Sequence, residues 1–197
     1  MTVLRRWLDA ALARLSTVGA DPDDDEDTRL RKALLVLIAA LILPISFIWA
    51  ALYIGFGSWT GWFAILYAAI SIASIAVFAR TRDFGLLLNI QLLDILLSPT
   101  VSTIPLGGFV PGGAVGIWGI LAPLGALVFI GVGAGVRWYV AFVALFLVTG
   151  IAGGLSGIAA TLPAWFSNVM LVLNITVGGS MVFTMLALFA RQRQDAL

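Results

Sequence analysis

Few side chains in this sequence could carry acid–base or metal chemistry. Histidine and cysteine are both absent, which removes the commonest metal ligands, the usual general base near neutral pH and the thiolate nucleophile. Carboxylates are the acid–base groups that remain, and Asp94 is the one that falls inside a long apolar stretch. We therefore predict no metal site and no catalytic residue in this chain.

Asp94 is the polar residue whose position most needs an explanation. It ends the segment Asn89-Ile-Gln-Leu-Leu-Asp94, roughly 18 Å along a helix from Arg82 at about 1.5 Å per residue. A carboxylate at that depth in a bilayer must be protonated, hydrogen-bonded or facing a wet cavity. We expect Asp94, Ser98 and Asn174 to line a small polar site or a polar contact between helices. The alternative is a neutral Asp94 that is merely satisfied by a neighbouring helix.

Six apolar stretches would have to position these side chains. The 197 residues are 61% hydrophobic, with a mean hydropathy of +1.09, which is too apolar for one soluble domain. A helix needs roughly 20 residues to cross about 30 Å of hydrocarbon. The predicted spans are approximately 33–56, 60–79, 85–104, 114–133, 138–158 and 167–190. We predict an all-α integral membrane protein whose six-transmembrane-helix bundle occupies 31–191, with the lipid bilayer as its main partner.

The distribution of basic residues predicts the orientation of this bundle. Arg and Lys precede the first span, Arg80 and Arg82 join the second span to the third, and Arg137 joins the fourth to the fifth. Arg191 and Arg193 follow the sixth span, and the other three connections contain no basic residue. By the positive-inside rule both termini are cytoplasmic. We expect a multi-pass protein of the cell inner (plasma) membrane.

Three further segments lie outside the predicted spans. Residues 1–18 predict a short amphipathic helix, lying on the inner membrane surface or packed on a partner. Residues 19–30 predict an acidic, solvated linker. Residues 192–197 predict a cytoplasmic exit. The charges are segregated and the formal net charge is +1, so nucleic acid is not expected as a partner.

Aromatic residues gather toward the predicted outer ends of the spans. There we expect them to be interfacial anchors at the headgroup level, as Trp and Tyr commonly are in membrane proteins. They are Trp49, Tyr53, Trp59, Trp62 and Trp165.

Glycines in the fifth predicted span indicate close helix packing. Gly150 with Gly154, and Gly153 with Gly157, form two overlapping Gly-x-x-x-Gly spacings, which let backbones approach closely. The spacing serves packing within one subunit or between two subunits equally well. We expect a homodimer.

Short motifs along residues 31–194 give the chain a family resemblance. They are Arg31-Lys32-Ala-Leu-Leu-Val-Leu-Ile with Pro44, Phe78-Ala-Arg80-Thr-Arg82, Gln91-Leu-Leu, Leu106-Gly-Gly-Phe109, Trp118-Gly-Ile-Leu-Ala-Pro123-Leu-Gly-Ala-Leu, Leu173-Asn174-Ile and Phe189-Ala-Arg191-Gln-Arg193-Gln. With these motifs the sequence resembles the N-terminal six-helix membrane region of bacterial class III adenylate or guanylate cyclases.

The resemblance implies a membrane anchor and dimerisation domain that senses a small lipophilic ligand. In that family a cytoplasmic domain after the sixth helix makes cyclic AMP from ATP, or cyclic GMP from GTP, using divalent metal. None of its catalytic residues can be placed on this sequence, so whether the chain belongs to an enzyme depends on a parent protein, and the chain itself needs no cofactor. A passive anchor is one alternative. A stand-alone small transporter or channel subunit, with Asp94 as its coupling site, is another.

Overall fold

The protein is helical throughout the residues that its structure describes. A computed structural model describes residues 17–158 and 162–195, with side chains of the last helix described as far as Ala187. The elements are α2 (Glu26–Gly55), α3 (Gly61–Thr81), α4 (Phe84–Ser102), the 3-10 helix η1 (Val115–Ile120), α5 (Leu121–Phe129), α6 (Val132–Leu155) and α7 (Ala164–Asp195). The predicted amphipathic helix over 1–18 lies almost wholly outside the described residues.

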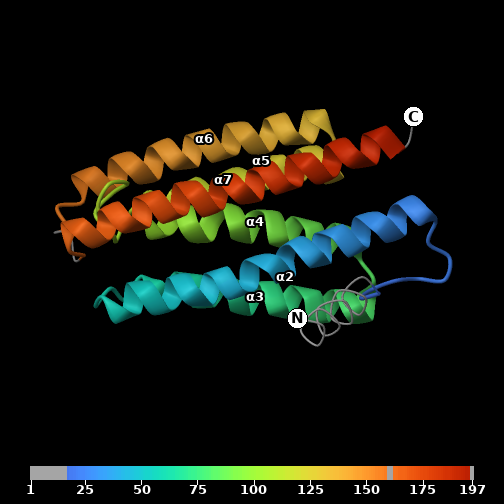
Figure 1. The fold of residues 1–197 in the computed structure, drawn as a ribbon, viewed down its shortest axis with the longest axis horizontal. Helices are drawn as coiled ribbons and strands as arrows, with labels where there is room; N and C mark the ends of the chain where they lie inside the picture. Colours follow the sequence, from blue (N-terminus) through green and yellow to red (C-terminus); the bar gives the residue numbers. More distant parts are fainter. Residues whose placement is uncertain (1–16, 159–161, 196–197) are drawn as a thin grey trace, which may run out of the picture.

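Helices α2, α3 and α4 run along the bundle in alternating directions, and so do α6 and α7 (Figure 1). In this view α2 begins, α3 ends, α6 begins and α7 ends at one end of the bundle. That end carries Arg31, Arg82 and Arg137, and we call it the basic end. The other end holds the α2–α3 connection, the α4–η1 connection and the start of α7.

Within the described part of the chain, five helices are long and apolar enough to cross a membrane. They are α2, α3, α4, α6 and residues Ala164–Ala187 of α7. The prediction of an all-helical, multi-pass membrane protein is confirmed in this coarse form. The fourth predicted span, 114–133, is not confirmed, because its helical part Val115–Phe129 is shorter and divides into η1 and α5. Gly113 and Ala114 have positive φ values of 62° and 54°, which prevents an α-helix from starting there.

Helices α2 and α6 begin well before the apolar spans predicted at 33–56 and 138–158. Helix α2 starts at Glu26 because Asp25 caps it: the Asp25 carboxylate accepts from the Thr28 backbone N–H at 2.8 Å, and acids in the first turn favour a helix N-terminus. Helix α6 starts at Val132, so Arg137 lies within this helix and not in the α5–α6 connection. The chain turns instead at Gly131.

The acidic segment before α2 is held against the basic end. The Lys32 ammonium lies 2.8 Å from both carboxylate oxygens of Asp24, and Arg82 lies 2.7 Å from Asp21. The hydrogen bond from Lys32, with a further one from the Asp21 backbone N–H, lowers the pKa of Asp24 below its ordinary value. The part of 19–30 predicted as a solvated linker is thus tied down by two ion pairs, and α2 begins within it.

The aromatic residues divide into a buried and an exposed group. Trp59 and Trp62 are each 61% exposed, as expected for interfacial anchors, and Trp165 is also exposed. Trp49 and Tyr53 are only 8% and 3% exposed, so the prediction that they anchor at the headgroups is wrong. They belong to the largest hydrophobic cluster, which packs α2 against η1 and α7.

Candidate functional site

Asp94 and Ser98 lie together on the buried face of α4. They are four residues apart, so the helix places them on the same face one turn from each other, and the Ser98 hydroxyl donates to Asp94 Oδ1 at 2.7 Å. The Asp94 side chain is only 5% exposed, and its Oδ2 has no hydrogen-bond partner among the described residues. Asp94 therefore orients the Ser98 hydroxyl and keeps one oxygen unused.

Tyr67 of α3 is the second buried polar group with unused capacity. It is 4% exposed, its hydroxyl has no partner in the described part of the chain, and it lies within electrostatic range of Asp94. The spacing of Tyr67, Ser71 and Ser74 places all three hydroxyls on one face of α3. That i, i+4, i+7 pattern in an otherwise apolar helix is the signal that could have identified Tyr67 from the sequence.

Gln91 continues this polar contact toward the basic end. Its amide Nε2 donates to the hydroxyls of Ser71 and Ser74, each at 2.9 Å. Sequence reasoning gave Gln91 no role, but here the amide joins α3 to α4 through buried hydrogen bonds. The α3–α4 interface is therefore polar over about two helical turns, from Ser74 and Gln91 to Tyr67 and Ser98.

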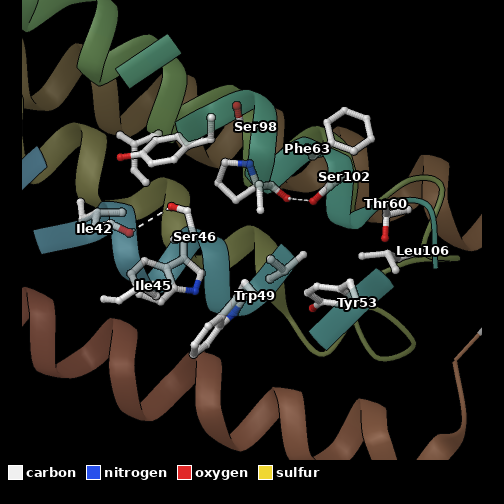
Figure 2. Close-up of a pocket in the computed structure, with 16 residues that line it drawn as sticks. Ile42, Ile45, Ser46, Trp49, Tyr53, Thr60, Phe63, Ser98, Ser102 and Leu106 are labelled. Atoms are coloured by element: carbon white, nitrogen blue, oxygen red, sulfur yellow. Dashed lines mark hydrogen bonds between the residues drawn. The ribbon is translucent and has the colours of Figure 1, made fainter. Parts of the chain in front are cut away.

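A cavity lies beside this interface, among α2, α3, α4 and η1 (Figure 2). The volume open to the centres of water molecules is about 70 Å³, which is room for several waters or a small ligand. Its polar wall residues are Ser46, Trp49, Tyr53, Thr60, Tyr67, Ser98, Ser102 and Trp118. Figure 2 shows the α2 residues on one side of the cavity and the α4 residues on the other.

Asn174 of α7 lies behind the two tryptophans of the cavity wall. Its Oδ1 accepts from Trp49 Nε1 at 2.6 Å and from Trp118 Nε1 at 2.7 Å, while its Nδ2 donates to the Gly113 carbonyl at 2.8 Å. Asn174 has no exposed surface, and the two indoles meet edge to face with centroids 6.0 Å apart. One side chain of α7 thus holds three groups from the rest of the bundle.

The three residues predicted to form one polar site therefore surround one cavity in different ways. Ser98 lines the cavity directly, Asp94 lies behind Ser98, and Asn174 lies behind Trp49 and Trp118. Among the described side chains no hydrogen bond joins Asn174 to Asp94 or Ser98. The sequence could not identify the tryptophans as its partners, because they precede Asn174 by 125 and 56 residues.

The glycines predicted for helix packing have different surroundings. A Cβ added to Gly153 would lie 2.7 Å from the Cα of Gly108, and one added to Gly150 would clash with the ring of Phe109. These two glycines therefore make room for the α4–η1 connection of the same chain. Added Cβ atoms on Gly154 and Gly157 would meet nothing within 4 Å, and Gly157 follows the end of α6.

The described residues contain no cluster of three acidic side chains that could hold a metal ion. Comparison of the chain with protein-family models, with curated proteins and with solved structures finds no match. Three features of the site itself bear on function: a cavity between the helices, two buried polar atoms without a partner among the described residues, and a hydrogen-bonded link from the cavity wall to α7.

Proposed function

We propose that this chain is a ligand-sensing membrane domain, in which the cavity binds a small lipophilic molecule and α7 transmits the response. The observation that carries the proposal is the position of Trp49 and Trp118. Both line the cavity, and both donate their indole N–H to Asn174 of α7. A molecule in the cavity would contact the same two rings that hold α7 in place.

Coupling between cavity and helix then follows from differential binding. A ligand changes the arrangement of α7 only if it binds one arrangement of the bundle better than another. Rotation of either indole on ligand contact would lengthen its hydrogen bond to Asn174, whose oxygen accepts from both rings. The position of α7 and the occupancy of the cavity would thus depend on each other.

The proposed topology has six crossings, with the basic end in the cytoplasm of a cell whose inner membrane holds the protein. Five crossings are the long apolar helices. The fourth would be η1 and α5: six 3-10 residues at about 2.0 Å and nine α-helical residues at about 1.5 Å give about 26 Å. This nearly matches the hydrocarbon thickness of about 30 Å. The basic end then lies on the side that the positive-inside rule requires.

The resemblance to the membrane region of class III cyclases supports two further parts of the proposal. Helix α7 would lead into a cytoplasmic cyclase-type output domain, and two copies would pair through the exposed faces of α6 and α7, where Val140, Val148 and Phe183 point away from the bundle. An antibody against residues 19–28 would measure the mass of the native protein. A band well above 20.9 kDa supports an output domain, and a band near that mass contradicts it.

The sensing proposal is tested by measuring the distance between α3 and α7 in nanodiscs. The chain has no cysteine, so Ile72→Cys and Leu186→Cys, both at exposed positions, introduce two spin labels for pulsed electron paramagnetic resonance. We expect saturating n-octanol, a small lipophile, to shift the distance distribution. Binding without any shift would leave a passive anchor, and the sensing proposal would fail.

One observation favours a transporter or channel as the second candidate function. The Asp94 carboxylate is buried within a candidate membrane span with an unpartnered oxygen, and such residues often mark ion or proton pathways. Proton or sodium flux into proteoliposomes that is abolished by Asp94→Asn would support this function. Equal flux with the wild-type protein and in protein-free liposomes would exclude it.

A further inference from the structure

Most hydrogen-bond donors on the cavity wall are already used within the protein. Three hydroxyls donate to backbone carbonyls: Tyr53 to Gly112 at 2.8 Å, Ser46 to Ile42 at 3.0 Å and Ser102 to Pro99 at 2.8 Å. Both indole N–H groups donate to Asn174. Each of these hydroxyl oxygens still has a free lone pair. The cavity wall therefore presents mainly hydrogen-bond acceptors to a ligand.

Ser98 is such an acceptor, and a hydrogen bond fixes the orientation of its hydroxyl group. Its proton is donated to Asp94 at 2.7 Å, which leaves the lone pairs of its oxygen for other partners. Asp94 does not line the cavity. The carboxylate therefore acts through Ser98, as a group that positions the serine hydroxyl.

Tyr67 is the exception among the donors. Its side chain is only 4% exposed and lines the cavity, while its hydroxyl has no hydrogen-bond partner in the described part of the protein. A buried hydroxyl without a partner is costly, and α3 holds this one at the cavity wall. The cavity thus presents the unpartnered donor of Tyr67 together with several acceptors.

The wall also determines the charge of a ligand. Among the described residues that line the cavity there is no Lys, Arg, Asp or Glu, and most lining atoms belong to aliphatic or aromatic side chains. An ion in the cavity would lose its hydration without finding a counter-charge among the lining residues, which is strongly unfavourable in such surroundings. The ligand should therefore be neutral.

We propose that the cavity binds a neutral lipophilic molecule that carries a hydroxyl group. The ligand hydroxyl accepts a hydrogen bond from the Tyr67 hydroxyl and donates one to the Ser98 oxygen. An alcohol is the simplest group that does both, since a hydroxyl has one proton and two lone pairs. An alkane fills the cavity without satisfying Tyr67, and a carboxylate or an ammonium brings an uncompensated charge. This inference rests on the proposed function, because it names the chemical class of the ligand at the same site.

Photolabelling of the purified full chain in nanodiscs tests the inference. The probe is a diazirine derivative of n-octanol, with n-octanol, octanoate, octylamine and octane as competitors of equal chain length. We expect saturable labelling on the cavity wall, with n-octanol as the strongest competitor. Tyr67→Phe should weaken competition by n-octanol roughly five- to tenfold, the value of one hydrogen bond, and leave octane unchanged.

Two other variants make the result specific. Tyr139→Phe removes the same atom from an exposed tyrosine of α6 and should leave competition unchanged, while Ser98→Ala should weaken n-octanol as Tyr67→Phe does. If octane competes as well as n-octanol and Tyr67→Phe has no effect, the hydroxyl inference is overturned, but the cavity remains a ligand site. If labelling does not saturate, or maps to the lipid-facing surface, the proposed function fails as well.

Discussion

Replacement of Asn174 by leucine tests the link between the cavity wall and α7. The substitution keeps a side chain of similar size but removes three hydrogen bonds, of 2.6, 2.7 and 2.8 Å, at a site with no exposed surface. Polar bonds between membrane helices contribute about 0.6 kcal/mol on average and about 1.7 kcal/mol at most. Three of them therefore predict a loss of about 2 to 5 kcal/mol in the free energy of unfolding.

The measurement is an equilibrium unfolding titration with dodecyl sulfate in mixed micelles, followed by circular dichroism. The matched control is Asn89→Leu, because Asn89 is exposed and its amide donates only to the Gly85 carbonyl of the same helix, at 2.9 Å. We expect the control to change the free energy of unfolding by less than about 0.5 kcal/mol.

A double-mutant cycle assigns the loss to the tryptophans. Trp118→Phe should cost less in the Asn174→Leu background than in the wild-type protein, because the hydrogen bond that it removes is already gone. If Asn174→Leu loses no more stability than Asn89→Leu, the network does not hold α7. The proposed route from cavity to helix would then have no physical basis.

Three further predictions concern other parts of the bundle. The pKa of the paired Asp24 carboxylate is lowered from its ordinary value of 3.8, so its contribution to stability is complete above that pH and is lost as the pH falls below it. The unfolding temperature should therefore decrease less between about pH 5 and about pH 3 in Asp24→Asn than in the wild-type protein. Gly153→Val should lower the unfolding temperature by colliding with backbone, whereas Gly154→Val, with open space around it, should not. Tyr67→Phe should raise the unfolding temperature of the ligand-free protein by removing an unpartnered buried hydroxyl, and a lowered value would contradict this account.

Hydrophobic run length predicted five helices correctly, since each of α2, α3, α4, α6 and α7 contains enough apolar residues to cross a bilayer. It failed at 114–133, because hydropathy does not distinguish an α-helix from a 3-10 helix of the same composition. Gly116 and Gly119 lower helix propensity within η1, and the positive φ at Ala114 is a property of the packed connection. The length of an apolar stretch therefore predicted a long helix only for segments whose backbone is regularly α-helical.

Of the candidate site, the sequence predicted only the contacts between residues of the same helix. The Asp94–Ser98 pair follows from their spacing on one helix, and the structure brings them together. Trp49 was predicted at the membrane interface because residue type and position along a span are all that sequence provides. In the structure it is buried, and its indole N–H donates to Asn174, which is 125 residues away; no periodicity in one sequence indicates such a pairing.

The contacts of α7 suggest how a small change at the cavity would be passed to the C-terminal part of this helix, which lies at the basic end. From Ser167 to Asn174 the helix is held by hydrogen bonds, since the Ser167 hydroxyl donates to the Pro111 carbonyl at 2.7 Å and Asn174 holds the two indoles. Between Asn174 and Ala187 the described side chains make no hydrogen bond to another element, and Met185 packs there by apolar contact. Apolar contacts tolerate sliding better than short hydrogen bonds do. A tilt of α7 about Asn174 would therefore keep these hydrogen bonds and change mainly apolar contacts, and the two tryptophans of the cavity wall would lie beside its pivot.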